Sequence, residues 1–222
     1  MVSARKTQLV SAKDLNQLPV SKLLVVICPG FHETNLTQRL IASLPSFVDC
    51  RVLETSPIAP VEICRTLVEY AEWLSPSPVA CPPVVGIGFS AGVLGLAGGL
   101  ALWQQQGGGR YRVSRLIAVD GWGVPVVGMP VTRLSHDYFT HLTSLPLGAG
   151  EVNFVAHPPV AHLNLWGQPE SVMGFEVSRC QGAKGVGMPM TAGQFLRRVL
   201  QAEWNGAFSW RHAAANAAHK SG

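Results

Sequence analysis

Short runs of consecutive apolar residues alternate along this chain with segments that have helical spacing. Leu23–Cys28 is the first such run and Val84–Ile87 is the second, and Val113–Val119, which Ser114 and Arg115 interrupt, is a further predicted strand. Continuous apolar runs of this length are typical of strands that a parallel sheet buries on both faces. In segment 60–74, apolar residues return at steps of three and four, which predicts an amphipathic helix. The uncharged segment 91–105 is predicted to be the helix that follows the second run.

Weaker signals of the same kinds continue this alternation. They predict strands at 51–53 and 151–156 and helices at 37–44 and 191–204. A chain of alternating strands and helices forms a mostly parallel sheet with helices on both faces, which is the α/β class. A length of 222 residues suits one domain with a large core, so we expect a single domain over residues 1–222.

Two segments are predicted to lie outside this regular pattern. Residues 122–150 are expected to be an insert with helical stretches that covers a site, and its apolar members would make that cover lipophilic. A segment that packs into the hydrophobic core, rather than over a site, would have the same composition. Residues 205–222 are rich in alanine and contain histidine, which favours a loosely held tail.

Composition narrows the classes of function. The net charge is only +4, and the basic residues are scattered without interleaved aromatic residues, which argues against a nucleic-acid-binding protein. Five cysteines without a CxxC spacing favour reduced core thiols in a cytoplasmic protein. No continuous apolar segment precedes Leu23, which argues against a signal peptide.

The uncharged segment from Val84 to Trp103 has the length of a membrane-spanning helix. Six glycines interrupt it, and two prolines precede it. A buried strand followed by a buried helix explains the same pattern without lipid, and we favour that interpretation. The membrane-embedded protein remains the less favoured alternative.

The motif Gly88-Phe89-Ser90-Ala91-Gly92 has the form GxSxG and lies between the predicted strand and helix. A serine on such a tight turn is lifted clear of the sheet, and side chains two positions before and after it would collide with the neighbouring strand and helix. Glycine avoids those collisions, and Gly95, Gly98 and Gly99 are expected to let the helix lie close to the sheet. The alternative is a buried turn whose serine only caps the helix.

With this strand–turn–helix motif, the order of elements over residues 23–204 resembles the α/β-hydrolase family. The resemblance implies that Ser90 is a nucleophile. It also implies that the loop Pro29-Gly30-Phe31-His32 supplies an oxyanion donor, so that the backbone N–H groups of Phe31 and Ala91 would face the developing negative oxygen. Pro29 stands where the family often has histidine.

A serine hydroxyl needs a base, and the base needs an acid that orients it. The family order of serine, acid and histidine implies Asp120 as the acid, because it ends the strand after the predicted nucleophile helix. An aspartate that only forms a turn before glycine is the alternative. Three other carboxylates remain candidates: Asp137, Glu170 and Glu176. The more usual acid position, after the next predicted strand, holds His157-Pro158-Pro159 instead.

Two histidines near the predicted strand 151–156 are candidates for the base. His162 opens a segment after a short loop, as a catalytic histidine of the family often does, and His157 is the alternative. His136 and His141 fall in the predicted insert and are candidates for a lid. No HxH or HxxxH spacing is present, so we expect no metal and no cofactor.

These expectations combine into a serine hydrolase that acts on an ester or thioester of a lipophilic acyl group. The alternative is a non-catalytic binding or scaffold protein that keeps the serine turn but has no complete set of catalytic residues. The expected partner is a small-molecule acyl ester, with peripheral contact to membrane or lipid. The sequence leaves the substrate, the choice between hydrolysis and acyl transfer, and the oligomeric state open.

Overall fold

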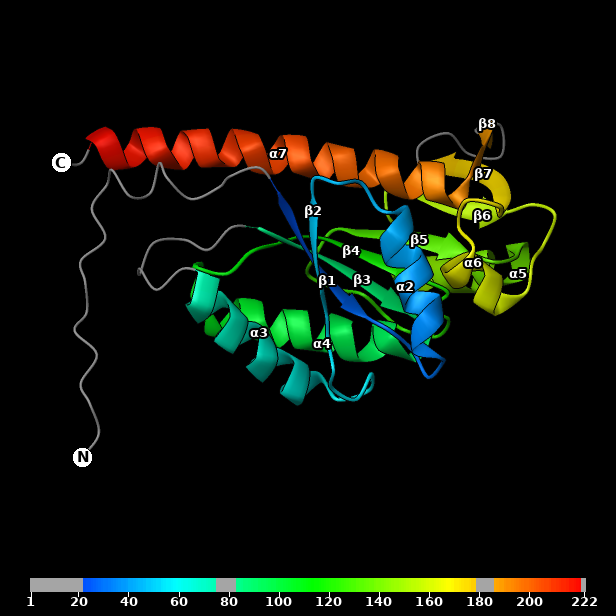
Figure 1. Cartoon of the computed structure of the whole chain (residues 1–222), viewed down its shortest axis with the longest axis horizontal. Helices are drawn as coiled ribbons and strands as arrows, with labels where there is room; N and C mark the ends of the chain where they lie inside the picture. The colour runs from blue at the N-terminus through cyan, green and yellow to red at the C-terminus, as the bar shows by residue number, and fades with distance from the viewer. Residues whose placement is uncertain (1–21, 75–82, 179–185, 221–222) are drawn as a thin grey trace.

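Strands and helices alternate through most of the chain (Figure 1). The structure is a computed structural model that describes residues 22–74, 83–178 and 186–220. The strands are β1 (Leu23–Cys28), β2 (Val48–Val52), β3 (Val84–Phe89), β4 (Val113–Val119), β5 (Val131–Ser135), β6 (Val152–Ala156), β7 (Met173–Ser178) and β8 (Val186–Thr191). The helices are α2 (Thr34–Ser43), α3 (Pro60–Leu74), α4 (Ala91–Gln106), α5 (Tyr138–Ser144), the 3-10 turn η1 (Leu145–Leu147), α6 (His162–Gly167) and α7 (Ala192–Lys220).

One sheet of eight strands organises the described chain, in the order β2-β1-β3-β4-β5-β6-β7-β8. The first six strands of that order are parallel, and β7 and β8 continue the sheet as antiparallel strands. The predicted α/β class with a mostly parallel sheet is therefore confirmed. The parallel strands place their carboxyl ends at a common edge, where the chain turns that carry the candidate residues lie.

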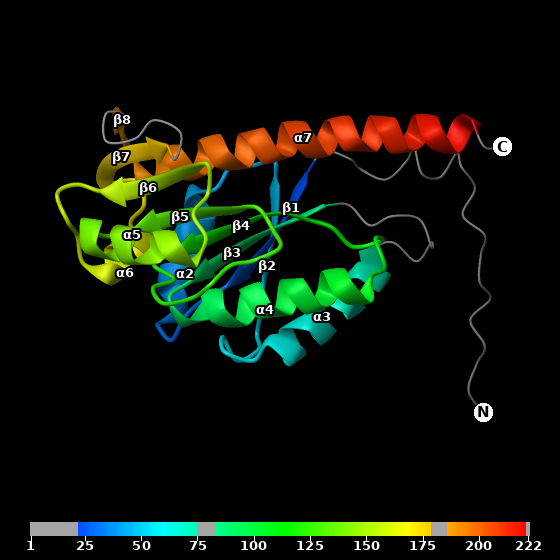
Figure 2. The same cartoon turned by 180° about the vertical axis from the view of Figure 1, so that it is seen from behind.

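Alternate residues of each central strand belong to two separate cores. Val25 and Ile27 of β1 pack with α2, α6 and α7, whereas Leu24 and Val26 pack with α3 and α4. Figure 2 shows α3 and α4 on the side of the sheet away from α7. Because β1 and β3 are buried on both faces, they appear in the sequence as continuous apolar runs.

The glycines of α4 have a different role from the one expected. A methyl group on Gly95 would lie 2.3 Å from the carbonyl oxygen of Pro57, and one on Gly99 would lie 2.5 Å from Cγ2 of Ile63. Gly98 likewise faces Pro60 at the start of α3. The expectation that these glycines bring α4 close to the sheet is wrong, because they bring it close to α3 and the loop before it.

Four regions differ from the sequence-based expectations. The predicted insert 122–150 contains β5, a fully buried strand in the middle of the sheet. Strands β7 and β8 were not predicted, and His162 begins helix α6 rather than lying on a loop. The last helix continues through the predicted tail to Lys220. The segment Val84–Trp103 is β3 followed by most of α4, as favoured.

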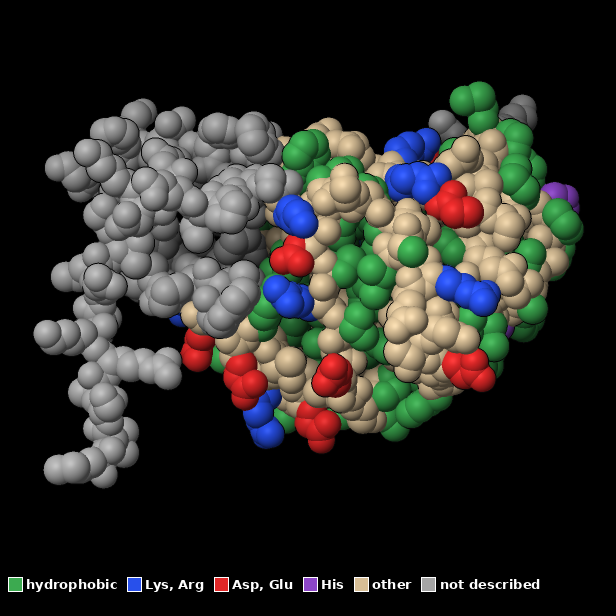
Figure 3. All heavy atoms as spheres, in the orientation of Figure 1, with side chains coloured by type: hydrophobic (Ala, Val, Ile, Leu, Met, Phe, Trp, Pro, Cys, Tyr) green, Lys and Arg blue, Asp and Glu red, His purple; other side chains and the backbone are tan. Residues whose placement is uncertain are grey.

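Within residues 22–74, 83–178 and 186–220, no helix combines the length and apolar character needed to cross a membrane. Cys28, Cys50 and Cys64 are free thiols, and Cys81 and Cys180 fall outside the described residues. Burial raises the pKa of the Cys28 thiol to about 12. On the face seen in Figure 3, acidic and basic side chains are interspersed. The cytoplasmic location and the lack of nucleic-acid binding stay predictions.

The close packing of α4 on α3 leads to a test with two helical glycines. Gly99→Ala should lower the free energy of unfolding by about 1–3 kcal/mol, because the added methyl group overlaps the buried Ile63 side chain. In α7, a methyl group on Gly206 would meet nothing within 4 Å. Gly206→Ala should therefore raise the free energy of unfolding by up to about 1 kcal/mol. Urea denaturation measures both, and a stabilising Gly99→Ala would contradict the packing described.

Candidate active site

Four side chains from separate segments meet at the carboxyl edge of the sheet. Ser90 follows β3, Asp120 follows β4, His136 follows β5, and His162 is the first residue of α6. All four line one cavity of about 550 Å³. Its other lining residues are Ile58, Ala91, Leu94, Trp122, Gly123, Val124 and Thr140. In open parallel sheets, ligands bind in a crevice at this edge.

Ser90 lies on the sharp turn expected of the GxSxG motif. Its backbone has a φ of 52° and a ψ of −121°, an unfavourable conformation for a residue with a Cβ. A Cβ on Gly88 would lie 2.9 Å from the Cα of Val93, and one on Gly92 would lie 2.3 Å from the carbonyl oxygen of Cys28. The flanking glycines are therefore needed to bring strand, turn and helix this close. The Ser90 side chain makes no capping hydrogen bond to α4, so the helix-cap alternative has no support.

Asp120 is the second described non-glycine residue with a positive φ, at 50°. Its side chain is only 1% exposed. The oxygen Oδ1 accepts a hydrogen bond of 2.9 Å from the backbone N–H of His136, and Oδ2 lies 2.9 Å from Nδ1 of His162. A buried carboxylate needs such partners, because a polar group without hydrogen bonds is costly to bury. The strained turn after β4 thus holds the carboxylate between two later segments of the chain.

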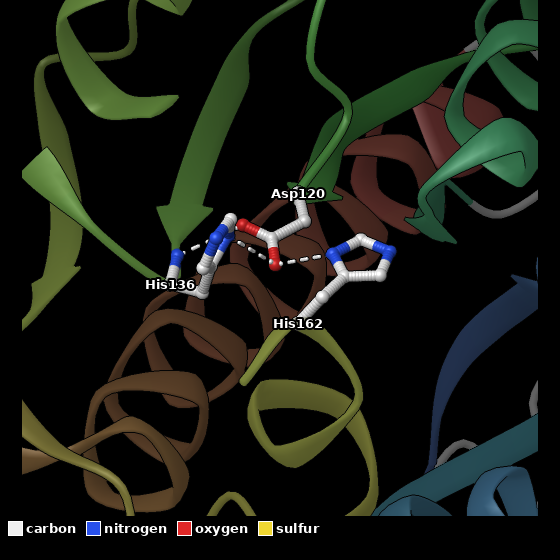
Figure 4. Close-up of side chains that lie close together, drawn as sticks. All are labelled: Asp120, His136 and His162. Carbon is white, nitrogen blue, oxygen red and sulfur yellow. Dashed lines mark hydrogen bonds and ion pairs between the residues drawn. The ribbon is translucent and has the colours of Figure 1, made fainter. Parts of the chain in front are cut away.

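The His162 ring is held between Asp120 and the aromatic residue before Ser90. It stacks on Phe89 with ring centroids 4.6 Å apart, while its Nδ1 hydrogen-bonds Asp120. Figure 4 shows the other ring nitrogen, Nε2, facing away from Asp120. The His162 side chain is 41% exposed toward the cavity that Ser90 also lines. No hydrogen bond joins the Ser90 hydroxyl to His162, a bond that in free enzymes is often long and shortens when substrate binds.

His136 is the member of this group that the sequence analysis did not place in the site. Its Nδ1 lies 3.0 Å from Oδ2 of Asp120, and its Nε2 lies 3.5 Å from Oδ2 of Asp137. The interaction with Asp120 raises the pKa of His136, against the opposing effect of burial. His136 comes close to Asp120 because β5 pairs with β4. Val119 of β4 pairs with Leu134 of β5, so the residues that follow the two strands lie side by side. Without that strand, no sequence signal indicated the contact.

The loop after β1, which the resemblance implied as a source of an oxyanion donor, lies against the serine turn. A Cβ on Gly30 would lie 3.3 Å from the Cβ of Ser90. Within the described part of the chain, the backbone N–H groups of Phe31 and Ala91 make no hydrogen bond, so both are available as donors. Ala91 lines the cavity, and the Phe31 side chain is 72% exposed.

The remaining candidates lie elsewhere. His157, the alternative base, is exposed beside Phe175 and does not line the cavity. Asp137 caps α5 by accepting a hydrogen bond from the N–H of Thr140. Glu170 pairs with Arg197, and Glu176 pairs with Arg198. The structure therefore brings together Ser90, Asp120 and His162, and it leaves His157, Glu170 and Glu176 apart from them.

A buried arginine fixes the loop that forms one wall of the cavity. Arg133 of β5 is 2% exposed, and its guanidinium donates to four carbonyl oxygens. These belong to Gly121, Val124, Leu147 and Gly148, at 2.6–3.3 Å. Burial lowers the pKa of the guanidinium. Gly121 directly precedes the cavity-lining residues Trp122 and Gly123, and Val124 lines the cavity itself. By binding their carbonyl oxygens and that of Leu147, Arg133 positions this wall and links it to the end of η1.

Potential metal ligands also meet here. Among residues 22–74, 83–178 and 186–220, one group of at least three candidate ligands occurs, formed by Asp120, His136 and His162. Their donor atoms all lie within 4.8 Å of one another. The sequence spacing gave no sign of this group, because each ligand comes from a different element.

Comparison with known proteins adds no family assignment. No protein-family model matches the chain, and no curated protein matches it. The function of the chain must therefore be inferred from the geometry of the site.

The carbonyl cage around Arg133 leads to a stability test. Arg133→Met keeps an unbranched apolar stem but removes the guanidinium, so the four carbonyl oxygens lose their donor. We expect the free energy of unfolding to fall by about 2–4 kcal/mol, measured by denaturant titration. Arg197→Met is the control, because its pair with Glu170 is exposed and should cost about 1 kcal/mol or less. Equal losses in the two variants would contradict the role given to Arg133.

Proposed function

We propose that this protein is a serine hydrolase of the α/β-hydrolase type that acts on an ester or thioester of a lipophilic acyl group. The observation that carries the proposal is the hydrogen bond of 2.9 Å between Asp120 and His162, made beside Ser90 on the wall of one cavity. A nucleophile, a base and an acid that orients the base are the groups acyl transfer needs. The mostly parallel sheet and the glycine-flanked turn agree with this family.

In the proposed reaction, Nε2 of His162 accepts the proton of the Ser90 hydroxyl while Oγ bonds to the carbonyl carbon. The electron pair of the C=O bond moves to oxygen, and the N–H groups of Phe31 and Ala91 donate to it. Asp120 stays ionised and stabilises the imidazolium. The leaving alcohol or thiol then takes the proton from His162. Water, activated by the same imidazole, hydrolyses the acyl–Ser90 bond.

The walls of the cavity favour an apolar acyl group. Ile58, Leu94 and Trp122 line it and remain 48–64% exposed. Exposed apolar side chains that converge on a concave site are typical of ligand-binding surfaces. The expected partner is therefore a small acyl ester, and contact with lipid or a membrane surface remains part of the proposal.

The alternative of a non-catalytic binding or scaffold protein is motivated by the lack of a carboxylate directly after the predicted strand 151–156. It would be favoured if every carboxylate lay beyond the reach of His162 and His157. Asp120 is within hydrogen-bonding distance of His162, so this motivation is removed. The choice between transfer of the acyl group to water and to another acceptor stays open.

A fluorophosphonate probe tests the nucleophile. The probe should label the wild type at Ser90, and Ser90→Ala should abolish both labelling and hydrolysis of p-nitrophenyl acyl esters, by about three orders of magnitude or more. Ser171→Ala is the matched control, because Ser171 is exposed and bonds only to the carbonyl of Gln168. Labelling of Ser90→Ala equal to that of the wild type would overturn the proposal.

The two candidate bases are separated by a matched pair of variants. His162→Gln should lose as much ester hydrolysis as Ser90→Ala, because among the described side chains His162 is the imidazole with both a hydrogen bond to Asp120 and an Nε2 that faces away from it. His157→Gln should keep the activity of the wild type. The opposite pattern would assign the base to His157 and remove the role proposed for Asp120.

A further inference from the structure

Two imidazoles share one carboxylate oxygen at the site. The Nδ1 atoms of His136 and His162 lie 3.0 and 2.9 Å from the same Oδ2 of Asp120 (Figure 4). The contact with His162 is a hydrogen bond. The Nδ1 of His136 is buried and makes no well-aligned hydrogen bond, although Asp120 is its neighbour. A second imidazole nitrogen therefore approaches the carboxylate in addition to the one that the proposed reaction uses.

Two imidazole nitrogens and one carboxylate oxygen form a ligand set that suits a borderline-soft divalent ion such as Zn²⁺. Tetrahedral Zn²⁺ with bonds of 2.0–2.1 Å holds its ligand atoms about 3.3 Å apart. The two N–O distances of 3.0 and 2.9 Å are shorter than this by only a few tenths of an ångström, and all three ligand atoms lie within 4.8 Å of one another. Both imidazoles are partly exposed, with 24% and 41% of their side chains accessible, although Nδ1 of His136 itself is buried. The cavity leaves room for a fourth ligand.

The outer contacts of the cluster are also those of a metal site. Nε2 of His136 lies 3.5 Å from Oδ2 of Asp137, so the nitrogen that would not bind metal faces a carboxylate. Oδ1 of Asp120, the oxygen that would not bind metal, accepts a hydrogen bond from the backbone N–H of His136. Metal-ligating histidines and carboxylates are oriented in this way by partners outside the ligand set.

We propose that Asp120, His136 and His162 bind a zinc-like divalent transition-metal ion, and that the bound ion inhibits the chemistry of Ser90. The inhibition rests on the proposed function, whereas the metal site does not. A neutral imidazole has one N–H and one lone pair. If Nδ1 of His162 gives its lone pair to the metal, the proton must be on Nε2, and that nitrogen then has no lone pair to accept the proton of Ser90.

Binding is tested without any substrate. Isothermal titration of metal-free protein with Zn²⁺, and the visible spectrum of protein loaded with Co²⁺, should show one site of tetrahedral type. His136→Asn removes one ligand and should weaken Zn²⁺ binding at least tenfold and abolish the Co²⁺ spectrum. His157→Gln is the matched control and should bind as the wild type does, because His157 lies outside the cluster. Equal binding by His136→Asn and the wild type would overturn the site.

Inhibition is tested by the ratio of fluorophosphonate labelling with and without Zn²⁺, taken within each variant. In the wild type and in His157→Gln, stoichiometric Zn²⁺ should reduce labelling at least tenfold, and a chelator should restore it. In His136→Asn the ratio should stay near one at the same Zn²⁺ concentration. Undiminished or increased labelling of zinc-loaded wild type would overturn the inhibition. If no form of the protein is labelled, the proposed function fails, while the binding measurements still decide the metal site.

Discussion

The site depends on a carboxylate that the fold has removed almost completely from water. Both oxygens of Asp120 are engaged, one by the backbone N–H of His136 and the other by the imidazole of His162. Burying such a group without partners would cost several kcal/mol, so the segments that supply these partners are held at the end of β4. The turn after β4, the start of the segment after β5 and the first residue of α6 are thereby joined at one point.

The parallel sheet explains why that point lies next to Ser90. Strands β3, β4 and β5 are neighbours and run in the same direction, so the residues that follow them emerge side by side. Two of those residues, Ser90 and Asp120, have a positive φ, which costs about 1–3 kcal/mol each. The flanking glycines and the buried carboxylate contacts maintain these turns. Backbone strain is thus concentrated where the side chains converge.

Sequence reasoning predicted most readily the strands whose residues are both apolar and buried on both faces. Strands β1 and β3 appear as continuous apolar runs because helices cover both of their faces, and the GxSxG turn between β3 and α4 followed from its glycines. Strand β5 was not predicted although it is just as buried, because Thr132, Arg133 and Ser135 interrupt its apolar pattern. The burial of Arg133 is possible because four backbone carbonyls accept from it, and that cage exists only in the folded chain.

The prediction of the site was limited in the same way, because some of its contacts exist only in the folded chain. Ser90 and Asp120 could be chosen because each directly follows a recognisable strand. His136 was assigned to an insert, because its place beside Asp120 depends on the pairing of β5 with β4. Which of the two later histidines contacts Asp120 also depended on the tertiary structure, since both follow β6 within a few residues. Contacts between side chains of different elements are set by register and packing, which the local sequence does not contain.

The site depends on the hydrogen bond between Asp120 and His162, and NMR of imidazole-¹⁵N-labelled, metal-free protein tests this bond directly. Neutral His162 should carry its proton on Nδ1, and this proton should resonate far downfield because it is donated to a carboxylate. The signal should disappear in Asp120→Asn with loss of that tautomer, and it should persist in His136→Asn. A His162 ring protonated only on Nε2, or a spectrum that Asp120→Asn does not change, would contradict this hydrogen bond.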